Sequence, residues 1–254
     1  MKTRLDKAIM QRGLASSRER AHALVLAGRV LVNEQKVEKA GATVDGGASI
    51  RILGDEMPFV SRGGLKLARA IEYWHIDVHD KVCMDIGTST GGFTDCLLQN
   101  GTSQVIAIDT GYGQIDVKLR SDPRVRLLEK TNARYLTADQ IWPDATRQMP
   151  ISFVAMDVSF ISTTLVLPAV VQCVRVSAAS GGFELVVLVK PQFEVGRERV
   201  GKGGIVRDAD AQQMAVQRVS ATVADLGGER IEVIDSPILG AEGNREFLLH
   251  AWFA

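Results

Sequence analysis

The stretch DIGTSTGGFTD, residues 85–95, contains the glycines of a loop that can hold a ligand. Gly87, Gly91 and Gly92 allow the backbone to turn tightly and to lie close to a bound group, because glycine has no Cβ and tolerates positive φ. The segment GTSTG also matches the G-x-S-x-G pattern of serine hydrolases. The loop is therefore compatible with two chemistries, the binding of a nucleotide-like cofactor and nucleophilic hydrolysis by Ser89.

A serine hydrolase needs more than this pentapeptide. Its serine stands on a strand-to-helix turn, and an acid and a histidine follow later in the chain. Only His250 follows Ser89, and it falls inside a stretch that predicts the last strand, where a loop residue is needed. Short patterns of this kind recur by chance. We therefore interpret the serine match as a coincidence and favour a cofactor loop.

Asp109 supports the cofactor interpretation. It follows Gly87 by 22 residues and ends the next apolar stretch, where a carboxylate in doubly wound folds hydrogen-bonds the ribose hydroxyls of a nucleoside cofactor. The loop has neither G-x-G-x-x-G nor Gly-Lys-Ser/Thr, the patterns that bind a pyrophosphate or a nucleoside triphosphate. The residues leave NAD and S-adenosylmethionine both open, and the missing pyrophosphate loop favours S-adenosylmethionine.

Two lysines and two carboxylates could carry out proton transfer. Lys190 ends the apolar stretch LVVLVK, Asp157 ends SFVAMD, Lys66 lies at the start of a helical stretch, and Glu246 opens the last strand. A lysine whose pKa is lowered by burial or by a nearby cation can act as a general base, which a poor nucleophile such as a ribose hydroxyl requires. For Lys66, the alternative interpretation is a solvated lysine on the helix surface.

These side chains meet only if the chain forms a parallel sheet. Apolar stretches alternate with helical ones along most of the chain, which predicts a doubly wound α/β fold with right-handed crossovers. Ligands bind such sheets beyond the carboxyl ends of the strands, and an antiparallel last strand would bring Glu246 to the same edge. We expect strands at 82–86, 104–109, 125–129, 152–157, 185–190, 230–235 and 245–252, and helices at 64–74, 92–100, 162–177 and 208–226.

The first 53 residues have the features of a separate basic module. They hold 10 Lys or Arg against 5 Asp or Glu, whereas the rest of the chain holds 20 against 25, out of 30 of each. Two helical stretches, the second with a Ser16–Glu19 capping box, precede strands in RVLVNEQKV and SIRIL, and GDEMP (54–58) predicts a linker. A compact basic module favours binding to a polyanion, and a solvated basic face is the alternative.

Cysteine usage and hydropathy indicate a cytoplasmic protein. Cys83, Cys96 and Cys173 are far apart and have no metal-type spacing, as expected for reduced core thiols. The N-terminus has no apolar region of a signal peptide. The most apolar stretch, 165–174, is shorter than the roughly 20 residues of a membrane span, so we expect no membrane association.

Five segments together resemble the TlyA family, the hemolysin/rRNA methyltransferases that are related to FtsJ-like ribose 2′-O-methyltransferases. They are VSRGGLKL, DIGTSTGGFTD, VAMDVSFIS, LVKPQFE and GNREFLLH. The resemblance extends through nearly the whole chain, and the N-terminal part is similar to the small RNA-binding fold of ribosomal protein S4. It implies an S4-like domain at 1–57, a linker at about 54–60, and a Rossmann-like class I methyltransferase domain at 58–254. That domain would have a seven-stranded, mostly parallel sheet with an antiparallel last strand.

The resemblance also implies the site residues. It implies a catalytic tetrad of Lys66, Asp157, Lys190 and Glu246, in which Lys190 takes the proton of a ribose 2′-hydroxyl and no metal is required. S-adenosylmethionine would be held by Asp85, Gly87, Thr88, Ser89, Gly91, Gly92, Asp109 and Asn132. Ribosomal RNA or a ribosomal subunit would be the partner, with phosphate contacts from Arg4, Arg18, Arg20, Arg29 and Lys36.

Two other functions stay open at this point. A chain of this kind could bind RNA without catalysis, although an intact tetrad argues against that. The family name hemolysin suggests a membrane-active protein, for which the sequence offers no spanning segment. The glycine- and arginine-rich stretch 196–204 is either a loop that closes over RNA or an ordinary surface loop. We expect the protein to be a monomer.

Overall fold

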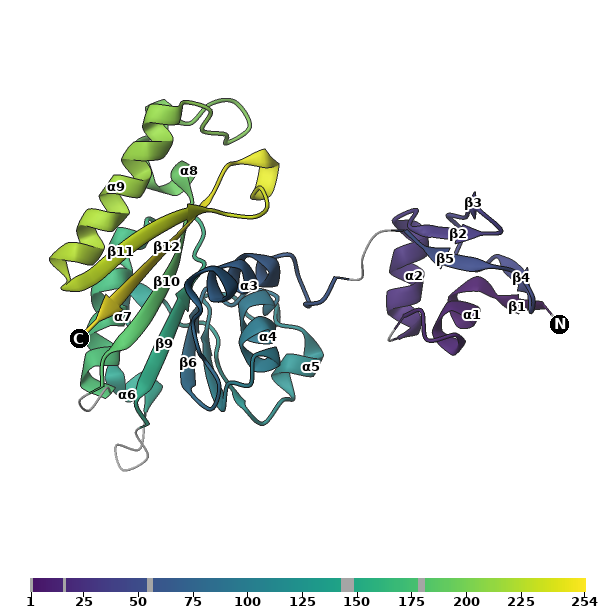
Figure 1. The fold of residues 1–254 in the computed structure, drawn as a ribbon, viewed down its shortest axis with the longest axis horizontal. Coiled ribbons are helices and arrows are strands. Elements are labelled where there is room, and N and C mark those ends of the chain that lie inside the picture. The colour runs from purple at the N-terminus through teal and green to yellow at the C-terminus, as the bar shows by residue number, and fades with distance from the viewer. Residues whose placement is uncertain (1, 16, 54–56, 143–148, 178–180) are drawn as a thin grey trace. The chain divides into compact units, whose positions relative to one another are not determined.

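The computed structural model describes residues 2–15, 17–53, 57–142, 149–177 and 181–254. The chain divides into two compact units, Met1–Met57 and Pro58–Ala254. Figure 1 shows the ribbon of each unit, and we describe them separately. Ser16 of the expected capping box and residues 54–56 of the expected linker lie outside the described residues.

The small unit packs two helices against short strands. Its first helix buries Leu5 and Ile9, and its second buries Ala21 and Val25, so that each helix turns an apolar face to the core of the unit. Strands β3, β2 and β5 form one antiparallel sheet in that order, and β1 pairs with β4. The elements are β1 (Lys2–Arg4), α1 (Leu5–Gln11), α2 (Arg18–Leu26), β2 (Val30–Val32), β3 (Gln35–Lys36), β4 (Thr43–Asp45) and β5 (Ile50–Ile52).

The second helix of the small unit begins after Ser17. The Ser17 hydroxyl accepts a hydrogen bond from the backbone N–H of Arg20 at 3.1 Å, which satisfies one of the free N–H groups of the first turn. The N-cap of α2 is therefore one residue later than the Ser16 of the predicted capping box.

The large unit contains the predicted doubly wound sheet. In the described part of the chain its seven strands have the order β11-β12-β10-β9-β6-β7-β8. β12 runs antiparallel to both of its neighbours, and the other neighbouring pairs are parallel. The strands are β6 (Val82–Ile86), β7 (Gln104–Ile108), β8 (Val125–Leu128), β9 (Ile151–Met156), β10 (Phe183–Val189), β11 (Gly228–Asp235) and β12 (Phe247–Phe253), each within two residues of its predicted bounds.

Helices cover both faces of this sheet (Figure 1). One apolar core contains Leu67 of α3, Leu97 of α4 and Leu119 of α5, and the core on the other face contains Val170 of α7 and Val219 of α9. The helices are α3 (Gly63–Trp74), α4 (Gly92–Gln99), α5 (Val117–Arg120), α6 (Ala138–Ile141), α7 (Leu167–Ser177), α8 (Pro191–Glu194) and α9 (Ala209–Asp225), with 3-10 turns at Ala133–Tyr135, Thr163–Leu165, Arg197–Arg199 and Ala241–Gly243.

The predicted helix at 162–177 is two elements instead of one. A 3-10 turn covers Thr163–Leu165, and α7 begins at Leu167. Pro168 explains the break, because proline has no N–H to donate and fits only the first turn of an α-helix. Among the described helices, none combines the length and the apolarity that crossing a membrane requires.

Candidate active site

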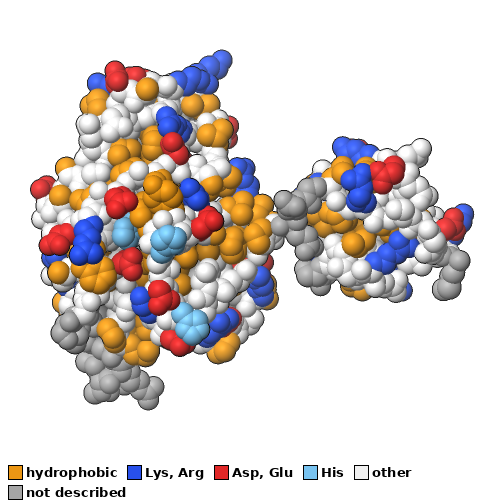
Figure 2. All heavy atoms as spheres, in the orientation of Figure 1, with side chains coloured by type: hydrophobic (Ala, Val, Ile, Leu, Met, Phe, Trp, Pro, Cys, Tyr) orange, Lys and Arg blue, Asp and Glu red, His pale blue; other side chains and the backbone are white. Residues whose placement is uncertain are grey.

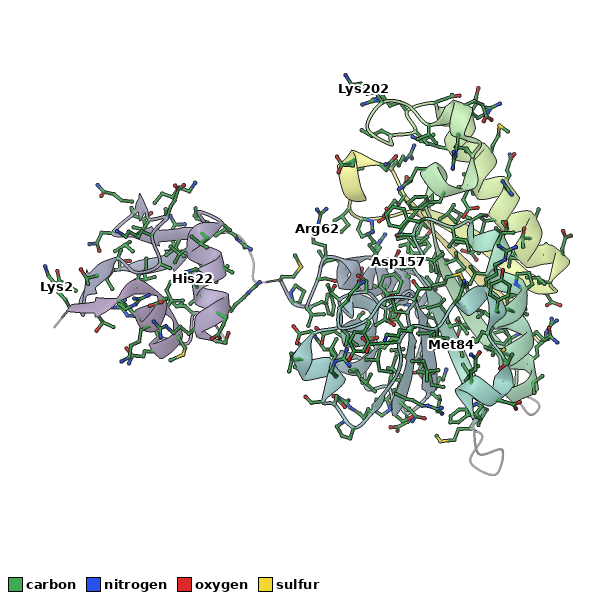
Figure 3. The ribbon with its side chains drawn as sticks, turned by 180° about the vertical axis from the view of Figure 1, so that it is seen from behind. Lys2, His22, Arg62, Met84, Asp157 and Lys202 are labelled. Carbon is green, nitrogen blue, oxygen red and sulfur yellow. The ribbon has the colours of Figure 1, made fainter. Side chains whose placement is uncertain are left out.

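The predicted polar residues gather at the edge of the sheet where the parallel strands end. Asp109, Asp157 and Lys190 directly follow β7, β9 and β10. Glu246 directly precedes β12, which runs antiparallel to β10. The first residue of β12, Phe247, pairs with the last residue of β10, Val189, and this pairing brings Glu246 to the same edge. Figure 3 labels Asp157 at this edge, beyond the end of the strands.

The loop after β6 lies against the backbone that carries Asp157. Gly87 has φ +87°, and a Cβ placed on it would lie 2.3 Å from the carbonyl oxygen of Asp157. The conformation and the contact each require glycine at this position. The ligand loop and the backbone at Asp157 therefore form one continuous wall.

Glycines also bring α3 against α4. A Cβ on Gly92, at the start of α4, would lie 2.8 Å from the backbone nitrogen of Gly64 in α3. This close approach carries Lys66, two residues further along α3, to the ligand loop. Lys66 is buried, with 8% of its surface exposed, so the interpretation of Lys66 as a solvated helix residue is wrong.

The larger of two neighbouring pockets lies over the ends of β6, β7 and β9 and has a volume of about 410 Å³. Asp109 at its wall accepts hydrogen bonds from the backbone N–H of Ser89 at 2.7 Å and of Gly111 at 2.6 Å. Asn132 accepts one from the N–H of Arg134 at 3.0 Å. Four of the predicted cofactor residues line this pocket, namely Gly87, Ser89, Asp109 and Asn132.

The other predicted cofactor residues lie outside this pocket. Thr88 and Gly92 line the smaller pocket described below. The Thr88 hydroxyl donates to the carbonyl oxygen of Asp85 at 3.2 Å, so it shapes the loop from inside. Gly91 is the N-cap of α4 with φ +97°, and Asp85 lies beneath the loop in β6.

Asp85 is a fully buried carboxyl with one oxygen that lacks a partner. Oδ2 accepts a hydrogen bond from the Thr94 hydroxyl at 2.6 Å, and Oδ1 has no hydrogen-bond partner among the described residues. Burial, and to a lesser extent the negative charges of Asp157 and Asp109, together raise the pKa of Asp85 to about 7, although the hydrogen bond from Thr94 lowers it. A buried acceptor of this kind fits a cationic ligand group, such as the ammonium of an amino-acid moiety.

The smaller pocket is lined by Lys66, Asp157 and Lys190, and Glu246 is joined to it through an ion pair with Lys66. Lys66 Nζ donates to Glu246 Oε2 at 2.6 Å, and both side chains are buried. Lys190 Nζ lies 2.5 Å from Asp157 Oδ1. The pocket has a volume of about 200 Å³ and shares Gly87, Ser89, Asp157 and Ser159 with the larger one. The structure thus brings all four predicted catalytic residues together beside the cofactor pocket.

Comparison with known proteins identifies the family of the chain. The FtsJ-like methyltransferase family matches residues 59–253, and the S4 domain matches residues 3–50. TlyA of Mycobacterium tuberculosis (strain CDC 1551 / Oshkosh), named a 16S/23S rRNA (cytidine-2′-O)-methyltransferase, is 41% identical over 249 residues, which are 98% of this chain and 89% of that protein. The chain belongs to the TlyA family.

Two further relatives agree with this assignment to the TlyA family. YqxC of Bacillus subtilis (strain 168), provisionally named an rRNA methyltransferase, is 46% identical over 249 residues, covering 98% of this chain and 85% of its own. A solved structure from Streptococcus thermophilus, provisionally named a hemolysin, is 41% identical, covers 100% of this chain and 89% of its own, and has a TM-score of 0.73. The predicted family and fold class are confirmed.

The S4 domain of this TlyA-family chain contains the five predicted RNA contacts. Arg4 and Arg18 both pair with the buried carboxylate of Asp6, at 2.8 Å and 3.2 Å, which holds the pKa of Asp6 well below its usual range. Arg29 Nε donates to the Leu53 carbonyl at 2.8 Å. Lys36 pairs with Glu38 at 2.9 Å, and Arg20 lies in the first turns of α2. Figure 2 shows Lys and Arg side chains at several points on the visible face of this domain.

Sequence reasoning missed several polar residues that support the TlyA-family site. Glu194 is buried and accepts hydrogen bonds from the Thr163 N–H at 2.8 Å and from the Thr163 and Ser162 hydroxyls. It thereby ties the loop after Asp157 to the helix after Lys190. Their signals in the sequence are that Ser162 and Glu194 lie within the family segments VAMDVSFIS and LVKPQFE, and that all three residues follow predicted strand ends by four to six residues.

Asn244 makes a similar connection on the other side of the TlyA-family site. It is buried, its Oδ1 accepts from the Val206 N–H at 3.0 Å, and its Nδ2 donates to the Gly204 carbonyl at 2.9 Å. The glycine-rich stretch 196–204 is thereby fixed at one end to the turn that precedes Glu246.

Proposed function

We propose that this chain transfers the methyl group of S-adenosylmethionine to a ribose 2′-hydroxyl of ribosomal RNA, with Lys190 as the general base. The observation that carries the proposal is the smaller pocket, which Lys66, Asp157 and Lys190 line and which shares residues with the larger pocket, while Glu246 pairs with Lys66. A hydroxyl that enters the smaller pocket meets Lys190, and the residues that line both pockets bring it beside the larger one. This arrangement suits proton removal coupled to attack on a group held in the larger pocket.

The chain's own residues fit the two ends of this cofactor. Asp109 and Asn132 both line the larger pocket, where Asp109 would hold the ribose hydroxyls and Asn132 would contact the adenine. Oδ1 of Asp85, which has no hydrogen-bond partner within the part of the chain that the structure describes, would accept from the methionyl ammonium directly or through an ordered water. S-adenosylmethionine supplies a methyl group on a positively charged sulfur when it is bound.

The four tetrad residues divide into a base and its supports. Lys190 removes the proton of the 2′-hydroxyl, and Asp157 holds the Lys190 side chain toward the pocket. Lys66 adds a positive charge that stabilises the developing oxyanion of the ribose. Glu246 compensates that buried charge and fixes the position of Lys66, because an unpaired ammonium in this place would be strongly destabilising.

The S4 domain supplies the RNA-binding part of the proposal. Arg4, Arg18, Arg20, Arg29 and Lys36 are the proposed phosphate contacts, with ribosomal RNA in a subunit as the partner and the cytoplasm, where ribosomes are, as the place of action. Arg4 and Arg18 keep about half of their side-chain surface exposed, 51% and 53%, while they pair with Asp6. They can therefore contact a phosphate without breaking those pairs.

The first experiment measures tritium transfer from labelled S-adenosylmethionine to the two ribosomal subunits and to naked rRNA. Wild type is compared with Lys190→Ala and with Lys81→Ala, a control at the opposite edge of the sheet beside β6. We expect label in ribose 2′-O-methyl nucleotides with wild type and Lys81→Ala, and none above background with Lys190→Ala.

Two other outcomes would redirect the proposal. Tight binding of S-adenosylmethionine and RNA without any label would favour a protein that binds RNA without catalysis. Wild-type transfer by Lys190→Ala would show that another group is the base.

A further inference from the structure

Ser159 stands in the smaller pocket although it belongs to neither the tetrad nor the glycine loop. It follows Asp157 by two positions, and its hydroxyl oxygen lies 2.8 Å from Lys190 Nζ. It lines both pockets and is itself exposed. A serine at the junction of the two pockets, in contact with the proposed base, can influence the direction of proton transfer.

The chemistry of the two groups fixes the direction of this hydrogen bond. Lys190 donates to the Ser159 oxygen, because an ammonium has no acceptor. Its other partner is Asp157, at 2.5 Å. A lysine nitrogen is tetrahedral, with one position bonded to Cε and three others. The hydrogen bond to Ser159 takes one of these, and the ion pair with Asp157 lies on another side of the nitrogen, which leaves a further position for the target hydroxyl.

We propose that Ser159 is a positioning residue for methyl transfer, which acts with Asp157 to fix the rotation of the Lys190 amine so that its lone pair faces the target hydroxyl. The inference rests on the proposed function of Lys190 as the base. In the neutral amine, two N–H groups donate to Asp157 and Ser159, and the lone pair occupies the third position.

The step then balances without a further reactant. The lone pair of Lys190 takes the proton of the ribose 2′-hydroxyl, and the 2′-oxygen forms a bond to the methyl carbon. The carbon–sulfur bond breaks, its electron pair stays on sulfur, and Lys190 ends as an ammonium. Both partners then accept from that ammonium, so that Ser159 also stabilises the product of the proton transfer.

Other charged groups adjoin Lys190, and a substitution at Ser159 leaves all of them in place. Asp157 contacts it directly, and Lys66, whose partner is Glu246, lines the same pocket. Asp85 lies beneath the loop, and Glu194 follows in α8 with its carboxylate turned to Thr163. A change in pH dependence in a Ser159 variant therefore reports the lost hydroxyl.

The test is single-turnover methyl transfer to ribosomal subunits from about pH 6 to about pH 9, with saturating S-adenosylmethionine. The variants are Ser159→Ala and Ser159→Thr. The matched control is Ser103→Ala, whose hydroxyl donates to the Lys81 carbonyl at 2.9 Å at the opposite edge of the sheet. Binding of S-adenosylmethionine, measured by calorimetry, checks that each variant is folded.

We expect Ser159→Ala to lower the plateau rate about tenfold, as the loss of one oriented hydrogen bond predicts. The rising limb of its profile of rate against pH moves to lower pH by roughly 0.5–1 pH unit, because the protonated lysine loses a hydrogen-bond acceptor. Ser159→Thr keeps a hydroxyl and restores the position of the limb, and Ser103→Ala behaves as wild type.

Three results would overturn the inference. A Ser159→Ala variant with the wild-type rate and an unmoved limb would refute it while leaving the proposed function intact. Equal losses in the Ala and Thr variants with the limb in place would mean that Ser159 only supports the local fold. Absence of transfer by the wild type would refute the proposed function itself, and the role of Ser159 with it.

Discussion

Replacement of Asp85 by Asn should make the protein without cofactor more stable while weakening its affinity for S-adenosylmethionine. The substitution preserves shape, and the new amide oxygen can still accept from the Thr94 hydroxyl that now bonds Oδ2 at 2.6 Å. The substitution removes a negative charge that is completely buried in the fold. One of the two Asp85 oxygens has no hydrogen-bond partner among the described residues. Such a charge lowers stability, because its desolvation is not compensated.

The magnitude of the stability effect follows from the pKa of Asp85, which burial raises to about 7. A carboxyl whose pKa is higher in the folded state than in the unfolded state contributes stability that is fully present below the unfolded pKa of about 3.9. This contribution is lost as the pH rises through the folded pKa. Each pH unit in that window costs about 1.4 kcal/mol, so the full window is on the order of 4 kcal/mol. Asn has no proton to lose, so the advantage of Asp85→Asn should grow by roughly 3 kcal/mol between about pH 5 and about pH 8.

Urea unfolding followed by tryptophan fluorescence measures this difference cleanly. All three tryptophans, Trp74, Trp142 and Trp252, lie in the large unit, so the signal reports the unit that contains Asp85. Calorimetry at about pH 8 should show S-adenosylmethionine binding weakened by roughly 10- to 150-fold in the variant, as the loss of a charge-assisted hydrogen bond predicts. Wild-type affinity should rise with pH through about 7, as the carboxylate forms. A stability difference that is the same at both pH values, or a variant less stable than wild type at the higher one, would refute the reasoning.

Three other substitutions test separate parts of the structure. Glu246→Ala leaves the buried ammonium of Lys66 without its partner and should lower the free energy of unfolding by about 3–5 kcal/mol in the same urea assay; an unchanged midpoint would mean that water reaches Lys66. Gly87→Ala should abolish calorimetric binding of S-adenosylmethionine, since its Cβ would lie 2.3 Å from the Asp157 carbonyl oxygen at φ +87°; retained affinity would contradict the required glycine. Arg20→Ala should weaken RNA binding and reduce the slope of log affinity against log salt by about 1; an unchanged slope would remove Arg20 from the phosphate contacts.

The sequence predicts the sheet well because the pattern that marks each strand lies within the residues of that strand. Continuous apolar runs such as VCMDI are typical of strands buried on both faces, and the polar residue at the end of each run marks the ligand edge. The short strands β1 and β4 were not predicted, since three residues show no period. The burial of Lys66 was not predicted either, because it depends on Gly64 and Gly92 letting two helices approach and on Glu246 arriving from the far end of the chain.

The partners of Lys190 show why the remaining part of the site needs the folded structure. Asp157 could be predicted as a neighbour, because it ends the strand beside β10. Ser159 lies in the family segment VAMDVSFIS, but nothing in that segment predicts its contact with Lys190. Its contact with Lys190 spans 31 residues and exists only because the loop after β9 turns back over the end of β10. The same loop lines both pockets. Glu194 holds this loop in place by accepting a hydrogen bond from the Thr163 N–H. The geometry of the base is therefore set by the loop after β9 as much as by the tetrad itself.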